Sequence, residues 1–283
     1  IIDMYAKCGG DVEDCCAVFD KLPKKELLPW CALIAAYTHL GDAQGALKKF
    51  QEMQDQGLKP NKMAYFNILK ACSMMDEPAQ GKLIHQQIKE SNLEEDPLVG
   101  SALIDMYCRC GSIKEGEYIF EALSCRDIVT WNTMITGYAR HGESDSLFYM
   151  LARMRMEGMN LDGITLLNTL TVCAHDGLVN EGQKFFHIVI ESYVTLTSIK
   201  HHHCMADLLG RAGQMKEAIE ILEKMPFQDD LVTWSTMLNA FNKQGHLDLG
   251  RETFESALKV EKTQSGLFIL MSNILAQNHC LEG

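Results

Sequence analysis

The sequence is short of proline and of long apolar runs. It has six prolines in 283 residues, and its longest mostly apolar stretch, Gly266–Leu275, is interrupted by Ser272 and Asn273. A membrane-spanning helix needs roughly 18 consecutive apolar residues, so we expect no membrane span. Sixteen methionines and few alternating runs of β-branched residues favour helices over strands.

The chain also lacks an excess of positive charge. It has 26 lysines and arginines against 38 acidic residues, a net charge of −12. A generic binder of DNA or of other polyanions would be basic, so we expect no DNA partner. The eleven cysteines are odd in number and scattered singly, unlike a secreted disulfide framework. They therefore predict reduced thiols in an intracellular compartment.

A turn residue recurs along the chain at a nearly constant interval. It is a glycine in six places and an aspartate in one: Gly41, Asp76, Gly111, Gly142, Gly177, Gly213 and Gly245. The successive steps are 35, 35, 31, 35, 36 and 32 residues. Trp30, Trp131 and Trp234 follow the same rhythm, 101 and 103 residues apart. Such a period identifies an array of structural repeats.

Each repeat is predicted to be a pair of helices separated by this turn. One apolar stripe with helical spacing comes before the glycine at 142 and another follows it: Trp131, Met134, Ile135 and Tyr138, then Leu147, Leu151 and Met154. A glycine ends a helix by adopting the left-handed conformation at low cost. A hairpin of this size cannot bury its apolar face alone, so neighbouring hairpins must stack. We therefore expect an all-α solenoid of helix–turn–helix repeats.

Three sequence motifs resemble those of a known family. They are Ile2–Gly9 (Ile-Asp-Met-Tyr-Ala-Lys-Cys-Gly), Leu103–Gly111 and Asp207–Gly213. With the uneven step length, they resemble pentatricopeptide repeat proteins of the plant organelle type, in the PLS class with C-terminal E-type extension motifs. The resemblance implies a right-handed superhelical solenoid and repeat units of about 1–26, 27–61, 62–96, 97–127, 128–162, 163–198 and 199–230. Residues 231–283 would form the extension motifs, the second of them truncated. Because the chain begins with Ile1 inside a repeat, we expect a fragment of a longer protein.

The same resemblance implies binding of single-stranded RNA in mitochondria or chloroplasts. The implied role is that of a specificity factor for C-to-U editing, acting with other editing factors or with a deaminase in trans. Each unit would contact one base through its fifth and its last residue. These pairs are Cys31 with Asn61, Phe66 with Asp96, Ser101 with Asp127, Asn132 with Asp162, Leu167 with Ser198, and His203 with Asp230.

The pairs differ in what the resemblance implies for them. Asn132 and Asp162 match the family's uridine-preferring pair, while Ser101 and Asp127 resemble the guanine-preferring class. Phe66 and Leu167 cannot recognise a base by hydrogen bonding. The apolar second residues of three units, Leu28, Leu98 and Val129, would sandwich the bases. A simpler role stays open for Asn61 and Asp162, because either residue could merely cap the following helix.

Cations recur at the thirteenth position of the first helices. The residues there are Lys7, His39, Met74, Arg109, Arg140, His175, Arg211 and Lys243. A cation at a helix C-terminus interacts favourably with the macrodipole. A row of cations would also follow RNA phosphates. We expect both effects, with phosphate contacts at Lys7, Arg109, Arg140, Arg211 and Lys243.

No enzyme activity, metal or other cofactor is expected. A zinc deaminase needs His-x-Glu and a later Cys-x-x-Cys; His141-Gly142-Glu143 supplies only the first, and no Cys-x-x-Cys exists. Cys108 and Cys110 are too close in sequence for a usual zinc site. His201–His203 is interpreted as a surface run in the first turn of a helix, with His203 available to a base.

The rival hypothesis is a tetratricopeptide-like scaffold that binds proteins and no RNA. Trp30, Leu33 and Tyr37 partly fit that pattern. The uneven unit length argues against it, since that family keeps a steady 34 residues. Ile34 and Ile135 also occupy a place where that family has glycine.

Overall fold

A computed structural model describes residues 11–23, 26–75, 78–192 and 199–223, together with Leu238, Phe254 and Ser272. All regular elements in this part of the chain are α-helices, which confirms the predicted all-α class. The helices fall into two compact units, residues 1–141 and 142–283. Each unit is described by itself.

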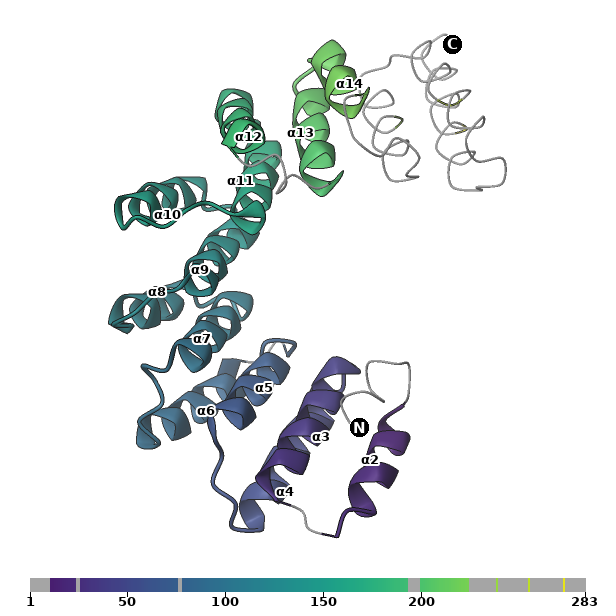
Figure 1. Ribbon diagram of the computed structural model, residues 1–283, viewed down its shortest axis with the longest axis vertical. Coiled ribbons are helices and arrows are strands. Elements are labelled where there is room, and N and C mark those ends of the chain that lie inside the picture. Colours follow the sequence, from purple (N-terminus) through teal and green to yellow (C-terminus); the bar gives the residue numbers. More distant parts are fainter. Residues whose placement is uncertain are drawn as a thin grey trace. The chain divides into compact units, whose positions relative to one another are not determined.

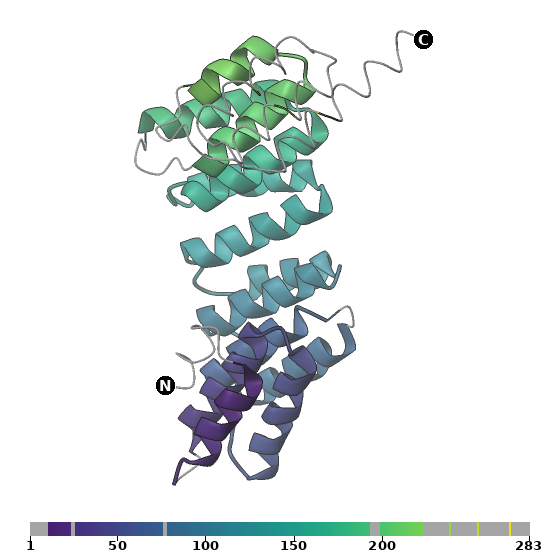
Figure 2. The same cartoon turned by 90° about the vertical axis from the view of Figure 1, so that its right-hand side faces the viewer.

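The first unit is built from helical hairpins laid side by side. Its helices are α2 (Val12–Asp20), α3 (Leu27–His39), α4 (Ala43–Asp55), α5 (Lys62–Cys72), α6 (Pro78–Glu90), α7 (Pro97–Arg109), α8 (Ile113–Ala122) and α9 (Ile128–His141). The first helices of successive repeats, α3, α5, α7 and α9, pack in a row, and α4, α6 and α8 each pack on the first helix of their own repeat (Figures 1 and 2). Homologous side chains therefore recur along one row of helices.

The second unit repeats the same construction. It contains α10 (Ser144–Met156), α11 (Gly163–Asp176), α12 (Val179–Ser192), α13 (Ile199–Arg211) and α14 (Met215–Glu223). The first helices α11 and α13 pack on each other, and α12 and α14 pack on α11 and α13. Leu170, Phe186, Met205 and Leu208 are among the residues of its hydrophobic core.

The turn glycines have the conformation that their spacing predicts. Gly41, Gly111, Gly142, Gly177 and Gly213 all have φ between +68° and +85°. L-residues with a side chain rarely adopt this region. The predicted recurring turn is thus confirmed at five positions. The other two turn residues, Asp76 and Gly245, lie outside the described residues.

The residues of the predicted apolar stripes are buried. Trp131, Met134, Ile135 and Tyr138 are all buried in α9, and Leu147, Leu151 and Met154 are buried in α10. Phe120 meets the edge of Trp131 with ring centroids 4.8 Å apart. Phe19 meets Trp30 in the same way at 4.7 Å. Each pair joins the end of one repeat to the first helix of the next, so the aromatic contact repeats with the array.

In the described part of the chain, no helix combines the length and the apolar character that crossing a bilayer requires.

Candidate nucleic-acid interface

A shallow hollow of about 460 Å³ lies along the first helices of the first unit. Its lining comes from α3 (Thr38, His39), α5 (Phe66, Lys70) and the two residues after it (Ser73, Met74), α7 (Ser101, Ala102, Asp105, Arg109) and α9 (Val129, Thr133). Three predicted RNA-contacting residues are among them: Ser101, expected to recognise a base, Val129, expected to sandwich one, and the cation Arg109. Phe66 occupies the same fifth position of its unit as Ser101. Because these helices are consecutive and parallel members of the array, the hollow is a groove that follows the repeats.

The readers Cys31 and Asn61 lie together in this unit. The Cys31 thiol donates to Asn61 Oδ1 at 3.6 Å. Burial raises the pKa of this thiol, which keeps it protonated and able to donate. Asn61 Oδ1 also accepts from the Ala64 backbone N–H at 2.9 Å and so caps α5.

The readers Ser101 and Asp127 are joined through a third residue, Thr130. Thr130 Oγ1 lies 3.0 Å from Ser101 Oγ and donates to Asp127 Oδ1 at 2.8 Å. The Thr130 backbone N–H donates to the same oxygen at 2.8 Å. The sequence analysis missed Thr130, although the Asp-x-x-Thr spacing that caps helices was visible.

The last residues of the units do cap the helices that follow. Asp96 caps α7, and Asp162 caps α11 in a capping box with Thr165. The capping alternative is therefore correct for Asn61 and Asp162. Capping does not exclude a base contact, because each side chain caps through one oxygen and has a second polar atom, the amide nitrogen in asparagine or the other carboxylate oxygen in aspartate.

For the other predicted base-contacting pairs, the described part of the structure does not show the two residues in contact. Asn132 is buried on α9 in the first unit, and Asp162 begins α11 in the second unit, so their pairing stays a prediction. Phe66, Leu167 and His203 are half-buried on α5, α11 and α13. Asp96, the partner of Phe66, caps α7, whereas Ser198 and Asp230, the partners of Leu167 and His203, lie outside the described residues.

Exposed apolar side chains mark the second position of the units. Leu28 is 80% exposed, Val129 57% and Leu98 36%. Met63 and Ile164 occupy the same position and are exposed as well; the sequence analysis missed them, although the repeat register marks their position. The exposure of these side chains leaves them accessible, and their role in sandwiching bases stays a prediction.

The predicted cations carry acidic partners. Arg109 Nε lies 2.8 Å from Asp105 Oδ2, Arg140 lies 3.8 Å from Asp105 Oδ1, and Arg211 Nε lies 2.8 Å from Asp207 Oδ2. Such partly exposed pairs are weak and are screened by salt, so a phosphate can compete for the guanidinium. Lys7 and Lys243 lie outside the described residues. Lys70, which the sequence analysis did not select, adds a cation to the hollow.

The prediction of a histidine surface run is wrong for two of its three members. His201 is buried, and its Nε2 lies 2.7 Å from the Gly163 carbonyl oxygen on α11. His202 is also buried and meets the edge of the Phe186 ring on α12. Two of the three polar side chains thus hold α13 on its neighbours, which a helix-start pattern does not reveal.

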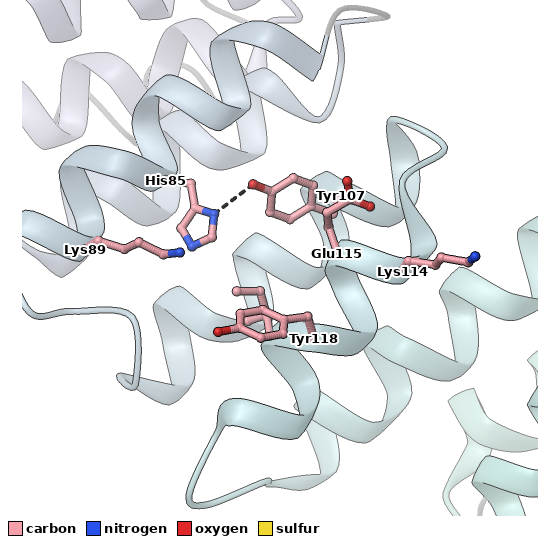
Figure 3. A pocket seen from close by; sticks show the side chains of 7 residues that line it. His85, Lys89, Tyr107, Lys114, Glu115 and Tyr118 are labelled. Atoms are coloured by element: carbon pink, nitrogen blue, oxygen red, sulfur yellow. Dashed lines mark hydrogen bonds between the residues drawn. The ribbon is translucent and has the colours of Figure 1, made fainter.

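A second hollow, of about 390 Å³, lies between α6, α7 and α8 in the first unit. Figure 3 shows His85 and Tyr107 pointing toward each other across it, with Lys89 on the same helix as His85. His85 Nδ1 lies 2.7 Å from Tyr107 Oη, and His85 Nε2 lies 2.9 Å from Glu94 Oε1. Both ring nitrogens of His85 are therefore engaged by the protein.

Protonation of His85 is expected to weaken the first unit. Burial lowers the pKa of His85, although its hydrogen bond to Glu94 acts in the opposite direction. Burial also raises the pKa of Tyr107 to about 12, so its hydroxyl stays protonated. Because the Glu94 carboxylate only accepts, Nε2 of the neutral His85 ring carries the proton, and Nδ1 accepts from the Tyr107 hydroxyl. The unfolded chain then binds more protons than the folded one, and stability falls as the pH drops below about 6.5.

We expect a loss of about 1 kcal/mol, the worth of one hydrogen bond, between neutral and mildly acidic pH. Urea unfolding at several pH values measures it. His85→Gln should remove this part of the pH dependence, and His187→Gln, at an exposed position on α12, should retain it. Identical pH profiles for wild type and His85→Gln would contradict the assignment.

Comparison with known proteins supports what the geometry indicates. The PPR repeat model matches residues 101–128, 129–159, 202–227 and 232–259, and a pentatricopeptide repeat domain model matches residues 10–75. Pentatricopeptide repeat-containing protein At1g08070, chloroplastic, of Arabidopsis thaliana is 35% identical over 98% of this chain and 37% of its own length. Pentatricopeptide repeat-containing protein At4g30700 of the same plant is 34% identical over 96% of this chain and 34% of its own length.

Solved structures show the same fold. PPR10 in complex with an 18-nt psaJ RNA element superposes with a TM-score of 0.73 at 18% identity, covering 88% of this chain and 37% of that one. PPR10 from maize gives 0.68 at 18% identity, with 99% and 43% covered. The chain spans just over a third of the length of the two curated relatives described above. The repeat period, the hairpin geometry and these matches together show that the chain belongs to the pentatricopeptide repeat family.

Proposed function

We propose that the chain binds single-stranded RNA along the groove of its first helices, one unit to one base, in organellar RNA processing. The observation that carries the proposal is the joining of side chains at the fifth and last positions of a unit. Cys31 contacts Asn61, and Ser101 is linked to Asp127. Two pairs of residues that lie far apart in sequence therefore meet at equivalent places in two repeats, 27–61 and 97–127.

The surroundings of these pairs suit a nucleic acid strand. Exposed Leu28, Leu98 and Val129 offer apolar surfaces on which bases can stack. Lys70 and Arg109 in the hollow can neutralise phosphates. A structural neighbour, PPR10, is described in complex with RNA, and one relative is named as chloroplastic. Localisation in a chloroplast or mitochondrion is part of this proposal.

The finer role that we propose is site recognition in C-to-U editing. The units of the repeat register, 1–26 to 199–230, would select the site, and residues 231–283 would act as extension motifs. A deaminase or other editing factors would act in trans. This assignment rests on the resemblance of the repeat phrases and on the alternating step length.

Selection from a randomised pool of short RNAs tests the proposal. The chain should enrich one sequence at low salt, with uridine at the position that Asn132 and Asp162 contact. Asn132→Ala should reduce the preference for uridine there about tenfold, the worth of one good base contact, and leave the other positions unchanged. Binding curves with the selected RNA and its single-base variants measure the effect.

Asn180→Ala is the matched control, because Asn180 is exposed on the second helix α12. It should change no base preference. Thermal unfolding of both variants ensures that folded proteins are compared. Failure of the wild-type chain to bind any RNA at low salt would refute the proposal and favour the protein-binding scaffold.

A further inference from the structure

The Thr130 hydroxyl lies between two predicted base-contacting residues, Ser101 and Asp127. Thr130 is fully buried, and its Oγ1 lies between Ser101 Oγ, at 3.0 Å, and Asp127 Oδ1, at 2.8 Å. The equivalent position of an earlier repeat holds Ala64, and there the Cys31 thiol reaches Asn61 directly. Thr130 therefore adds a polar group to a base-reading pair that another repeat builds without one.

The number of available protons determines which group donates in the hydrogen bonds of Thr130. An ionised carboxylate only accepts, and a hydroxyl has one proton to donate. Thr130 gives its proton to Asp127 Oδ1, so in its contact with Ser101 it must accept. Ser101 consequently donates to Thr130 and keeps only lone pairs for a ligand. In the described part of the chain, Asp127 Oδ2 accepts no hydrogen bond, and it also offers lone pairs only.

We propose that Thr130 is a specificity-determining positioning residue, which holds Ser101 and Asp127 as a pair of acceptors and thereby selects a base that presents donors. The inference rests on the proposed RNA binding. Guanine presents two adjacent N–H groups on its Watson–Crick edge. Uracil presents one N–H group between two carbonyl oxygens, and those oxygens would face the lone pairs of the protein. Buried polar groups without a complementary partner penalise the wrong ligand.

Loss of the Thr130 hydroxyl should release the Ser101 proton. Ser101 could then donate to a carbonyl oxygen or a ring nitrogen of another base, so discrimination at this nucleotide would fall. The capping role of Asp127 would persist, because the backbone N–H of residue 130 still donates to it. The change therefore acts on selectivity rather than on the helix start.

The same hydroxyl arrangement occurs in the second unit. Thr165 Oγ1 donates to Asp162 Oδ1 at 2.9 Å, and the Thr165 backbone N–H donates to the same atom at 2.9 Å. The corresponding position after Asp96 is Val99, which has no hydroxyl. The hydrogen bond from a threonine hydroxyl to the last residue of the preceding unit thus occurs in individual repeats, and the fold does not require it.

Thr130→Val provides the test, because valine keeps the shape and removes the hydroxyl. With the RNA selected by the wild-type chain, the preference for guanine at the nucleotide of Ser101 and Asp127 should fall about three- to tenfold, the effect of one hydrogen bond. Preferences at other nucleotides should stay as they were. Thr130→Ser, which keeps the hydroxyl, should preserve the guanine preference.

Further variants show whether Thr130 positions Ser101 or only stabilises the fold. Thr130→Val should add nothing to Ser101→Ala if it acts through Ser101, as a double-mutant cycle would show. Thr169→Val is the matched control, since Thr169 is buried and its hydroxyl donates to the Thr165 carbonyl oxygen, away from the groove residues. It should leave every base preference unchanged. If Thr130→Val fails to fold, Thr130→Ala, which suits a helix interior, takes its place.

The outcomes distinguish this inference from the proposed function. An unchanged guanine preference in folded Thr130→Val, or an equal loss of affinity for every RNA, would overturn the role of Thr130 and leave RNA binding intact. A wild-type chain that binds no RNA would overturn both.

Discussion

Replacing Trp131 with alanine is expected to lower the free energy of unfolding of the first unit by about 3–5 kcal/mol, as for other large side chains removed from a core. The Trp131 side chain is completely buried and meets Phe120 edge-on, with an interplanar angle of 76°. Its loss opens a cavity between α8 and α9, where one repeat packs on the next. Because each repeat contacts only its neighbours, the damage should be local.

Urea unfolding and hydrogen exchange together measure this effect. We expect faster exchange in α7, α8 and α9 of the variant than in α3 and α4. Tyr118→Ala is the matched control, since Tyr118 is an aromatic residue of α8 that is 66% exposed. It should change stability by less than about 0.5 kcal/mol, as surface substitutions usually do. Equal losses from Trp131→Ala and Tyr118→Ala would show that the repeat contact is not what stabilises the unit.

Much of the fold could be predicted because the repeats impose local rules. The spacing of Trp131, Met134, Ile135 and Tyr138 placed one face of a helix in the core, and all four are buried. Gly41 and its equivalents marked the helix ends, and those described have positive φ. Periodicity and backbone conformation are properties of neighbouring residues, so a single sequence contains them.

Contacts between helices were harder to predict. The partner of Trp131 is Phe120 on the preceding helix, and helical periodicity says nothing about which residues meet between one hairpin and the next. His201 and His202 look like surface residues, but they bind a carbonyl oxygen and an aromatic ring on α11 and α12. Polar residues can be buried when the neighbouring helix supplies a partner, and only the packing shows that partner.

For the candidate site, the positions of the residues could be predicted from the repeat register, but the contacts between them could not. The repeat register gave the positions of Ser101 and Asp127, because it depends on spacing alone. Thr130, which joins them, belongs to the next unit, so an analysis taken one unit at a time overlooks it. Asp105 was also overlooked, although its spacing of four residues from Arg109 allows a helical ion pair.

Replacement of Lys70, Arg109 and Arg140 by alanine is expected to weaken RNA binding on the order of a hundredfold at 0.1 M salt. Lys70 and Arg109 line the hollow, and Arg140 shares the partner Asp105 with Arg109. Each lost phosphate contact with a single strand should reduce the slope of log affinity against log salt by about 0.7, or about 2 for three contacts. Base preferences should not change, because phosphates are the same in every sequence.

The acidic character of the chain makes the control for this triple variant essential. Alanine replacing Lys48, Lys82 and Lys114 removes the same charge from exposed positions on the second helices α4, α6 and α8. We expect a much smaller loss of affinity and an almost unchanged salt slope. Asp105→Asn should act in the opposite direction and raise the affinity for all RNAs about fivefold, since it removes the acidic partner of Arg109 and Arg140. Equal losses from the two triple variants would mean that the net charge of −12, and not the groove, governs encounter with RNA.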